Sequence, residues 1–163
     1  MALFFFMNFA VNNDFYLILP DIRSCHNVGA MFRTADACGV TKIFLVGYTP
    51  CPPRPQIDKV SLGAELWVPW ERKNNLKRLV KTLKKRGVAI VGLEKNAVSR
   101  DIGGISFSRP IALIVGNEVD GVRPDILDLC DYVAHIPMRG RKESLNVSVA
   151  AGIALYEIGK TAS

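Results

Sequence analysis

Short apolar runs alternate along the chain with stretches in which apolar residues recur at helical spacing. One apolar run, residues 67–70, contains Pro69 and is expected at a sheet edge, because proline lacks the N–H that an inner strand would donate to its neighbour. Strands are predicted at residues 15–19, 42–46, 67–70, 88–93, 111–115 and 132–136. Helices are predicted at residues 27–38, 74–86, 124–129 and 147–158, and residues 48–56, with four prolines, are expected to form an irregular loop. This alternation predicts an α/β domain with a mostly parallel sheet flanked by helices.

The first predicted helix has a recognisable start, end and buried face. Asn27 is a residue type that favours the N-cap, and Gly39 suits the position just after the helix. Four apolar residues fall on one side at helical spacing: Val28, Met31, Phe32 and Ala35. Arg33 lies mid-helix beside this face, where its long side chain can reach across to a neighbouring loop.

Residues 74–86 carry the clearest amphipathic pattern. One side is an apolar stripe made of Leu76, Leu79, Val80 and Leu83. The other side carries Lys77, Lys81, Lys84 and Lys85, and Gly87 ends the helix. A basic face of this kind is most often simply solvated, but it also suits contact with an RNA backbone. The pattern alone leaves both interpretations open.

Length, charge and cysteine usage narrow the class of protein. The 163 residues are expected to form one domain, with residues 1–12 as an extension. The net charge of +6 favours an acidic partner, with nucleic acid ahead of membrane. The four cysteines form no C-x-x-C pair and the two histidines are not at metal-ligand spacing, so no metal site is expected. Reduced cysteines indicate a cytoplasmic location, and the apolar residues 1–10 are too few to span a membrane.

Three polar stretches of the kind that bind ligands follow predicted strands. They are residues 27–40, residues 115–122 and residues 136–148. The second has glycines at both ends of an acidic turn, and the third places basic residues, Ser144 and Asn146 before the last helix. Loops that leave buried strands are where α/β proteins bind ligands. The second stretch lacks the P-loop ending and the G-x-G-x-x-G spacing, which disfavours a triphosphate cradle or a nicotinamide-dependent dehydrogenase.

Taken together, the three stretches resemble the three motifs of the SpoU/TrmH family of RNA ribose methyltransferases, within the SPOUT superfamily. The resemblance runs over residues 15–158, and all three motifs occur in order, each after a strand. It implies S-adenosylmethionine as methyl donor, S-adenosylhomocysteine as product and a ribose 2′-hydroxyl of tRNA or rRNA as acceptor. It also implies a deep trefoil knot in the C-terminal half and a homodimer. No appended RNA-binding domain is expected, and neither a membrane nor DNA is expected as a partner.

The resemblance also implies roles for individual residues. The expected catalytic residues are Asn27 and Arg33 in the first motif, Glu118 in the second, and Ser144 and Asn146 in the third. The expected donor-binding residues are Leu93, Gly116, Asn117, Gly121, Ile136, Met138, Ser144 and Leu145.

The chemistry of the implied reaction suits these residue types. A sulfonium donor carries its own leaving group, so holding the methyl group and the ribose oxygen in line supplies much of the acceleration. Apolar walls at Ile136, Met138 and Leu145 suit an adenine. Gly116 admits close backbone approach, and Gly116→Val is expected to fill the donor pocket between the strand ends. Because arginine stays protonated, Arg33 is expected to orient a phosphate and stabilise a developing alkoxide rather than act as a base.

The last predicted helix is apolar nearly all round, which is typical of a buried helix. Small and large apolar residues alternate in it: Val149, Ala150, Ala151, Gly152, Ile153, Ala154, Leu155 and Ile158. Part of this helix is therefore expected to contact a second copy, with the helix at residues 27–38 nearby. Two other functions remain open from the residues: an RNA-binding protein of this fold without catalysis, and a base methyltransferase of the same superfamily.

Overall fold

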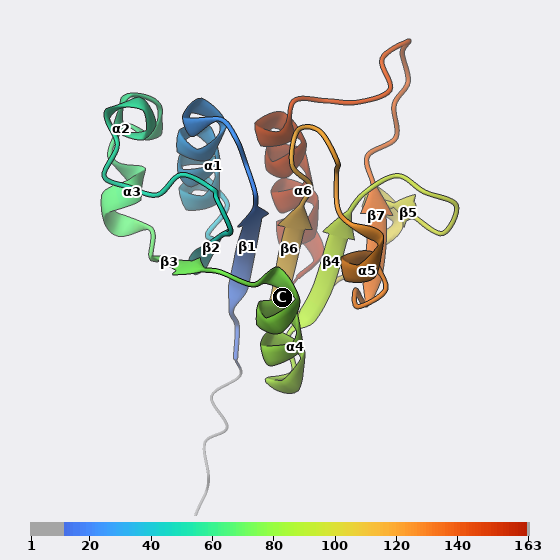
Figure 1. Cartoon of the computed structure of the whole chain (residues 1–163). Coiled ribbons are helices and arrows are strands. Elements are labelled where there is room, and N and C mark those ends of the chain that lie inside the picture. The colour runs from blue at the N-terminus through green and yellow to red at the C-terminus, as the bar shows by residue number, and fades with distance from the viewer. Residues whose placement is uncertain (1–11, 163) are drawn as a thin grey trace, which may run out of the picture.

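Seven strands, all paired in parallel, form one sheet at the centre of the molecule (Figure 1). The computed structural model describes residues 12–162, so the apolar residues 1–10 considered above lie outside the described residues. The strands are β1 Phe15–Pro20, β2 Lys42–Val46, β3 Trp70–Lys73, β4 Ala89–Leu93, β5 Arg100–Asp101, β6 Ile111–Val115 and β7 Tyr132–His135. Their order across the sheet is β3-β2-β1-β6-β4-β7-β5. The predicted α/β fold with a parallel sheet is confirmed.

Helices cover both faces of this sheet. On one face lie α1 (Cys25–Ala37) and α6 (Val147–Thr161), with α2 (Pro55–Ser61) and α3 (Ala64–Trp67) beside α1 (Figure 1). On the other face lie α4 (Leu76–Lys85) and α5 (Pro124–Leu127). A short 3₁₀ turn, Ile102–Gly104, follows β5. None of the helices that the structure describes has the length and apolar character needed to cross a membrane.

The central strands β1 and β6 are buried along their whole length because both of their faces are covered. Successive side chains of a strand point to opposite faces. In β1, Phe15, Leu17 and Leu19 therefore join the core under α1 and α6. Tyr16 and Ile18 join the second core, under α4. The continuous apolar runs of the sequence thus serve two cores.

Two predicted boundaries are wrong for identifiable reasons. The first helix begins at Cys25 rather than Asn27, because Ser24 is the N-cap and accepts a hydrogen bond from the Asn27 N–H. Residues 64–67 are helical, and the edge strand follows at Trp70–Lys73, three residues later than predicted. The helix α2 was not predicted because the prolines suggested a loop, although Pro55 occupies its first turn, where proline is well tolerated.

The other predicted elements agree with the structure to within a few residues. Gly39 lies just after α1 with φ +70° and Gly87 just after α4 with φ +79°, so both occupy the left-handed position that ends a helix. The four residues predicted for the buried face of α1 are fully buried. Since all strands are parallel, the carboxyl ends of β1, β4, β6 and β7 meet at one edge of the sheet. The second and third stretches identified in the sequence, residues 115–122 and 136–148, and the start of the first, at Asn27, lie at that edge.

Candidate active site

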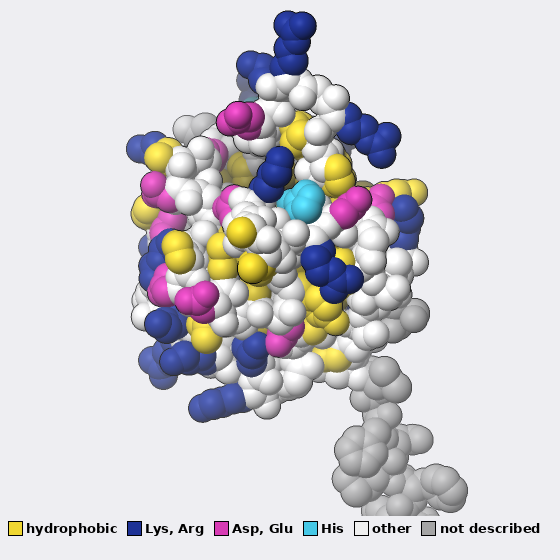
Figure 2. All heavy atoms as spheres, turned by 90° about the vertical axis from the view of Figure 1, so that its right-hand side faces the viewer, with side chains coloured by type: hydrophobic (Ala, Val, Ile, Leu, Met, Phe, Trp, Pro, Cys, Tyr) yellow, Lys and Arg dark blue, Asp and Glu magenta, His cyan; other side chains and the backbone are white. Residues whose placement is uncertain are grey.

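A cavity of about 830 Å³ lies at the carboxyl ends of β4, β6 and β7. Its walls contain all of the residues predicted to bind the donor, namely Leu93, Gly116, Asn117, Gly121, Ile136, Met138, Ser144 and Leu145. Figure 2 shows this side of the molecule, with a hollow beneath a protruding loop, hydrophobic side chains within it and basic side chains around it. The tertiary structure therefore brings together residues from three separated segments of the chain.

The segment between β6 and α5 forms a tight turn that makes one wall of the cavity. Asn117 and Gly121 pair as an isolated β-bridge, and Asn117 Oδ1 accepts hydrogen bonds from the N–H groups of Val119 (2.9 Å) and Asp120 (2.6 Å). Gly121 has φ +66°, a conformation that favours glycine. A Cβ on Gly116 would lie less than 3.0 Å from the backbone of Gly121. The two glycines therefore let the turn close on itself.

A side chain at Gly116 would collide with neighbouring backbone rather than simply fill the cavity. The sequence suggested that a side chain at Gly116 would fill the donor pocket. In the structure the added Cβ would collide first with the backbone of Gly121 and Val122, within the turn itself. Gly116→Val would therefore displace the turn, and any loss of donor binding would follow from that displacement.

Three polar side chains from distant parts of the sequence form a hydrogen-bonded chain beside the cavity. The Asn27 amide donates through Nδ2 to Glu118 Oε1 at 3.0 Å and accepts through Oδ1 from Asn146 Nδ2 at 3.2 Å. Asn146 Oδ1 also accepts from the Ser148 N–H at 2.9 Å and so caps α6. Asn27, predicted as the cap of α1, is instead a buried link between the second and third motifs.

Glu118 is held as a carboxylate by three N–H donors from the start of α1 and the residues before it. Its oxygens accept from the backbone N–H groups of Arg23 (3.1 Å) and Ser24 (3.3 Å) in addition to Asn27. Partial burial by itself raises the pKa of Glu118, but the hydrogen bonds from Arg23, Asn27, its own backbone and Ser24 outweigh it and hold the pKa below its ordinary value. The carboxylate therefore joins the start of α1 to the turn after β6.

The outer wall of the cavity comes from the segment between β7 and α6. Ser144 and Leu145 line the cavity and are otherwise exposed to solvent. Lys142 and Glu143 lie next to them on the same wall. This placement suits contact with a ligand that enters from outside.

Arg33 lies apart from the other four predicted catalytic residues. It is exposed and lines a separate hollow beside α2, together with His26, Gln56 and Lys59. Six residues of helix turn the side chain by about 600°, so Arg33 projects roughly 120° away from Asn27 around α1. The expectation that Arg33 would reach a neighbouring loop of the same active site is therefore not met within one chain.

Two further residues that line the cavity, Glu94 and His135, lie outside the three motifs. Glu94 follows β4, lines the cavity and accepts a hydrogen bond from the Val122 N–H at 2.8 Å, which supports the turn after β6. His135 ends β7, lines the cavity and lies 2.9 Å from Ser99 Oγ through Nδ1. Both could have been found by examining the residue at each strand end, the rule that identified the residues 115–122.

The profile of the SpoU rRNA methylase family matches residues 14–156, which is most of the chain. The chain belongs to this family. It is 40% identical over 141 residues to the 23S rRNA (guanosine-2′-O-)-methyltransferase RlmB of Vibrio parahaemolyticus, a match that covers 86% of this chain and 57% of that relative. It is 35% identical over 144 residues to the putative TrmH family tRNA/rRNA methyltransferase YacO of Bacillus subtilis, covering 88% of this chain and 57% of that one. The resemblance inferred from the three motifs is confirmed.

Solved structures of SpoU proteins have the same fold. An AdoMet-bound rRNA methyltransferase from Sinorhizobium meliloti superposes with a TM-score of 0.85 at 32% identity, covering 91% of this chain and 57% of that one. The A. aeolicus TrmH/SpoU tRNA modifying enzyme superposes with a TM-score of 0.83 at 32% identity, covering 92% and 76%. This chain therefore spans somewhat more than half the length of most of these SpoU relatives, and those relatives differ in the RNA that they modify.

Proposed function

We propose that this protein transfers a methyl group from S-adenosylmethionine to a ribose 2′-hydroxyl of tRNA or rRNA and leaves S-adenosylhomocysteine. The observation that carries the proposal is the single cavity that gathers all eight predicted donor-binding residues at the strand ends. Membership of the SpoU family and relatives named as 2′-O-methyltransferases support it. A cytoplasmic location is part of the same proposal, since ribosomal RNA is the substrate of several relatives.

The cavity fits the proposed donor in size and in the character of its walls. Its volume of about 830 Å³ lies within the range of pockets that enclose drug-sized ligands, roughly 300–1,000 Å³. Leu93, Ile136 and Leu145 offer apolar contact to an adenine, and the turn beginning at Gly116 offers backbone groups to its polar edges. When bound, S-adenosylmethionine supplies a methyl group on a sulfonium leaving group, so the methyl carbon is already activated.

The residues of the chain contribute to this reaction by orienting the ribose and by stabilising the charge that develops on its oxygen. The ribose oxygen must be held in line with the methyl carbon. Orientation of this kind can lower the activation free energy by roughly 7–11 kcal/mol. Ser144 and Asn146 line the cavity in the segment before α6 and are suited to hold the ribose. The carboxylate of Glu118 keeps Asn27 and Asn146 in place through hydrogen bonds. A cation near the ribose would stabilise the oxygen as it loses its proton, and Arg33 is the proposed cation.

Arg33 requires a second copy of the chain to take this role, because it projects away from its own cavity. The last helix has an unpartnered apolar face with Val149 50%, Ile153 38% and Tyr156 64% exposed. This face adjoins α1, since Thr34 of α1 lies against Gly152 of α6. A homodimer formed through α6 and α1 would bury the apolar face and bring Arg33 of one subunit toward the cavity of its partner.

Mixing two inactive variants tests both the activity and the position of Arg33. Arg33→Ala is expected to abolish methyl transfer and keep donor binding, whereas Leu145→Glu is expected to spoil the donor pocket and keep Arg33. Co-expressed together, they should recover about a quarter of the wild-type rate, because half of randomly mixed dimers hold one working site of two. The rate is measured as tritiated methyl incorporated into RNA, with the label located by nuclease digestion.

No recovery in mixed dimers that form and bind the donor would place Arg33 outside the site of the partner. Label on a base rather than on ribose would make the protein a base methyltransferase. Arg33→Lys should stay impaired at every pH if the planar guanidinium orients a phosphate. If a deprotonated side chain were the base, activity would return as the pH rises toward the lysine pKa of about 10.4.

We propose that the chain also forms the deep trefoil knot in its C-terminal half. The chain leaves β7 beyond β4 and returns to α6, which packs against α1 and β6. This return passes the turn after β6, with which it shares the cavity, and a return of this kind allows the chain to thread a loop. Stretching the unfolded chain from both ends in optical tweezers would leave a tightened knot. The extended length would then fall short of that expected from ~3.3–3.6 Å per residue.

A further inference from the structure

A second, smaller cavity lies on the other side of the turn that follows β6. Its volume is about 250 Å³, below the roughly 300–1,000 Å³ of pockets for drug-sized ligands. It lies between the carboxyl ends of β1 and β2, the start of α4 and the turn. Asn117 and Gly121 line both this cavity and the larger one. A ligand here would therefore contact the wall of the proposed donor site from its far side.

The walls of the small cavity combine apolar residues and amide groups with one carboxylate, Asp21, which accepts a hydrogen bond from the Tyr48 N–H at 3.1 Å. Pro20, Val46, Leu76 and Val122 supply the apolar contacts. Asn75 and Asn117 use their side-chain oxygens in local turns, at 2.9 Å from the Arg78 N–H and 2.9 Å from the Val119 N–H. Their amide nitrogens, and the whole amide of Asn74, have no hydrogen-bond partner within residues 12–162. Apolar faces with amide donors and acceptors at the edge suit an unstacked nucleobase.

The exposed face of α4 begins at this cavity and is strongly basic. Residues 74–93 contain six lysines and arginines and no acidic residue. Lys77 lies 3.8 Å from Asp125 and Lys84 lies 2.7 Å from Asp131, so two of the six have an acidic neighbour. The remaining four have none among the residues that the structure describes: Arg78, Lys81, Lys85 and Arg86. This face carries more positive charge than its local partners neutralise.

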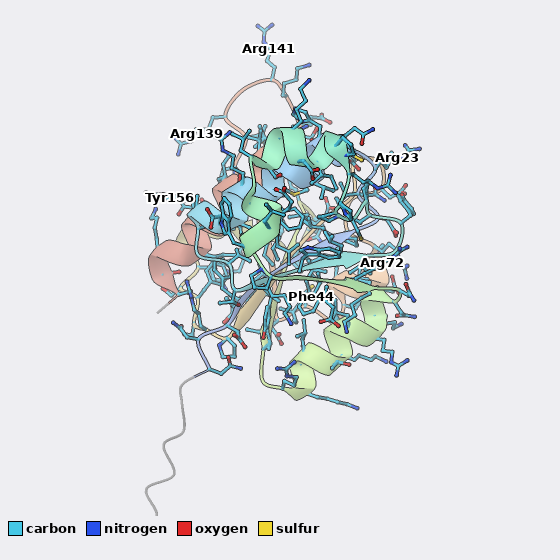
Figure 3. The ribbon with its side chains drawn as sticks, turned by 90° about the vertical axis from the view of Figure 1, so that its left-hand side faces the viewer. Arg23, Phe44, Arg72, Arg139, Arg141 and Tyr156 are labelled. Atoms are coloured by element: carbon cyan, nitrogen blue, oxygen red, sulfur yellow. The ribbon has the colours of Figure 1, made fainter. Side chains whose placement is uncertain are left out.

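The basic surface continues from α4 toward the carboxyl edge of the sheet. Figure 3 shows Arg72 just above α4 on the right of the view, with Arg23 higher, at the level of α2. Figure 2 likewise shows basic side chains gathered at its lower left, the side on which α4 lies. The cavity and the basic face of α4 adjoin, because Asn75 and Leu76, which line the cavity, also start α4.

We propose that this surface is the path of the RNA substrate: the small cavity binds one nucleobase of the RNA, and the basic face of α4 binds the phosphates that follow it. The inference rests on the proposed function and adds to it a binding surface outside the donor site. RNA explains the surface better than an anionic membrane does, because a membrane would use the cations of α4 but not the amide-lined cavity. Contact with Asn117 and Gly121 also couples a bound base to the turn that shapes the donor pocket.

Matched pairs of substitutions test the surface without touching the donor site. Lys81→Gln with Lys85→Gln removes two charges from α4. The control, Lys42→Gln with Arg109→Gln, removes two charges at the opposite, amino-terminal edge of the sheet, so both variants have the same net charge. In the cavity, Asn74→Asp adds a negative charge without changing shape, and its control is Asn13→Asp at the same opposite edge.

Affinity for protein-free 23S rRNA and for bulk tRNA is measured across a range of salt concentrations, and donor affinity by calorimetry. In the α4 pair, loss of two phosphate contacts should make the slope of log association constant against log salt concentration less steep by about 1.4. This value takes ~0.7 for each contact with single-stranded RNA. Asn74→Asp should weaken RNA binding several-fold. Both controls should bind RNA as the wild type does, and all four variants should bind the donor normally.

Equal slopes in the α4 pair and its control, with wild-type RNA binding and methyl transfer intact, would overturn this inference and leave the proposed function standing. A wild type that binds and methylates neither RNA would overturn both. Lysine-dependent binding of α4 to vesicles of anionic phospholipid, without an effect of the same lysines on RNA binding, would assign the surface to a membrane and also overturn it.

Discussion

Glu118 illustrates how a single side chain can join separated parts of a site. It belongs to the turn after β6, yet its partners are two backbone N–H groups and one amide at the start of α1. The sequence motifs identify Glu118 and Asn27 but do not pair them, since the two residues are 91 positions apart. Only the parallel order β1-β6, which places the two strand ends side by side, brings them into contact.

The lowered pKa of Glu118 predicts a pH dependence of stability. A carboxyl whose pKa is lower in the folded state stabilises the fold above its ordinary pKa of about 4.3, and this contribution is lost as the pH falls through the lower folded value. Glu118→Gln should therefore lower the melting temperature at pH 6–7 by more than at pH 3. Glu157→Gln is the control, because that carboxylate pairs with the exposed Lys160. Equal melting-temperature losses at both pH values would contradict the assignment.

Gly116 provides a second prediction for a single residue. A Cβ at Gly116 would lie less than 3.0 Å from backbone atoms of Gly121 and Val122, so Gly116→Ala must move the turn. Overpacking of this kind costs roughly 1–3 kcal/mol of unfolding free energy. Donor affinity should fall together with stability, as measured by denaturant unfolding and calorimetry. Gly104→Ala is the control, since nothing lies within 4 Å of its Cβ position, and it should change neither quantity.

The start of α1 shows what sequence patterns can and cannot define about an element. The buried face of the helix followed from apolar spacing, because that spacing is a property of the local chain. Ser24 and Asn27 are both of types that cap helices, so residue type did not decide which one does. The choice depends on Glu118, which binds the Asn27 amide and leaves Ser24 to accept the Asn27 N–H.

This assignment of the cap predicts a specific loss of stability. Ser24→Ala removes the oxygen that accepts the Asn27 N–H but keeps the Ser24 N–H that donates to Glu118. The free energy of unfolding should fall by about 1 kcal/mol, the usual value of an N-cap. Denaturant unfolding of Ser106→Ala, an exposed serine in a loop, serves as the control. A loss no greater than that of the control would show that Ser24 is not the effective cap.

At the scale of the whole molecule, the exposed apolar face of α6 predicts a homodimer. Ile153→Glu places a charge on that face and should convert a dimer at micromolar concentration into a monomer, as measured by light scattering. Leu66→Glu makes the same change on α3, where the side chain is 82% exposed. It should leave the dimer intact. A wild type that is monomeric, or a dimer dissociated by Leu66→Glu alone, would show that α6 is not the interface.

The sequence by itself determined most of the elements and the family of this protein. Strand and helix periodicities are local properties, so the alternation of elements, their buried faces and the glycine ends of α1 and α4 were predictable. The three motifs, each a short contiguous stretch after a strand, were enough to indicate the SpoU family and the residues of one cavity. The sequence could not distinguish α3 from a strand, because residues 64–70 contain too few periodic positions and a proline.

The tertiary structure decided how these pieces meet. It made Asn27 a link between Glu118 and Asn146 instead of a cap, because strand order brings α1, the turn after β6 and the start of α6 together. It showed that Gly116 packs against Gly121, a contact within a turn that spacing alone does not reveal. It also directed Arg33 away from its own cavity, since the rotation of a helix fixes where each side chain points once one face is buried. Contacts between segments distant in sequence depend on the packing of the whole chain, which no local pattern contains.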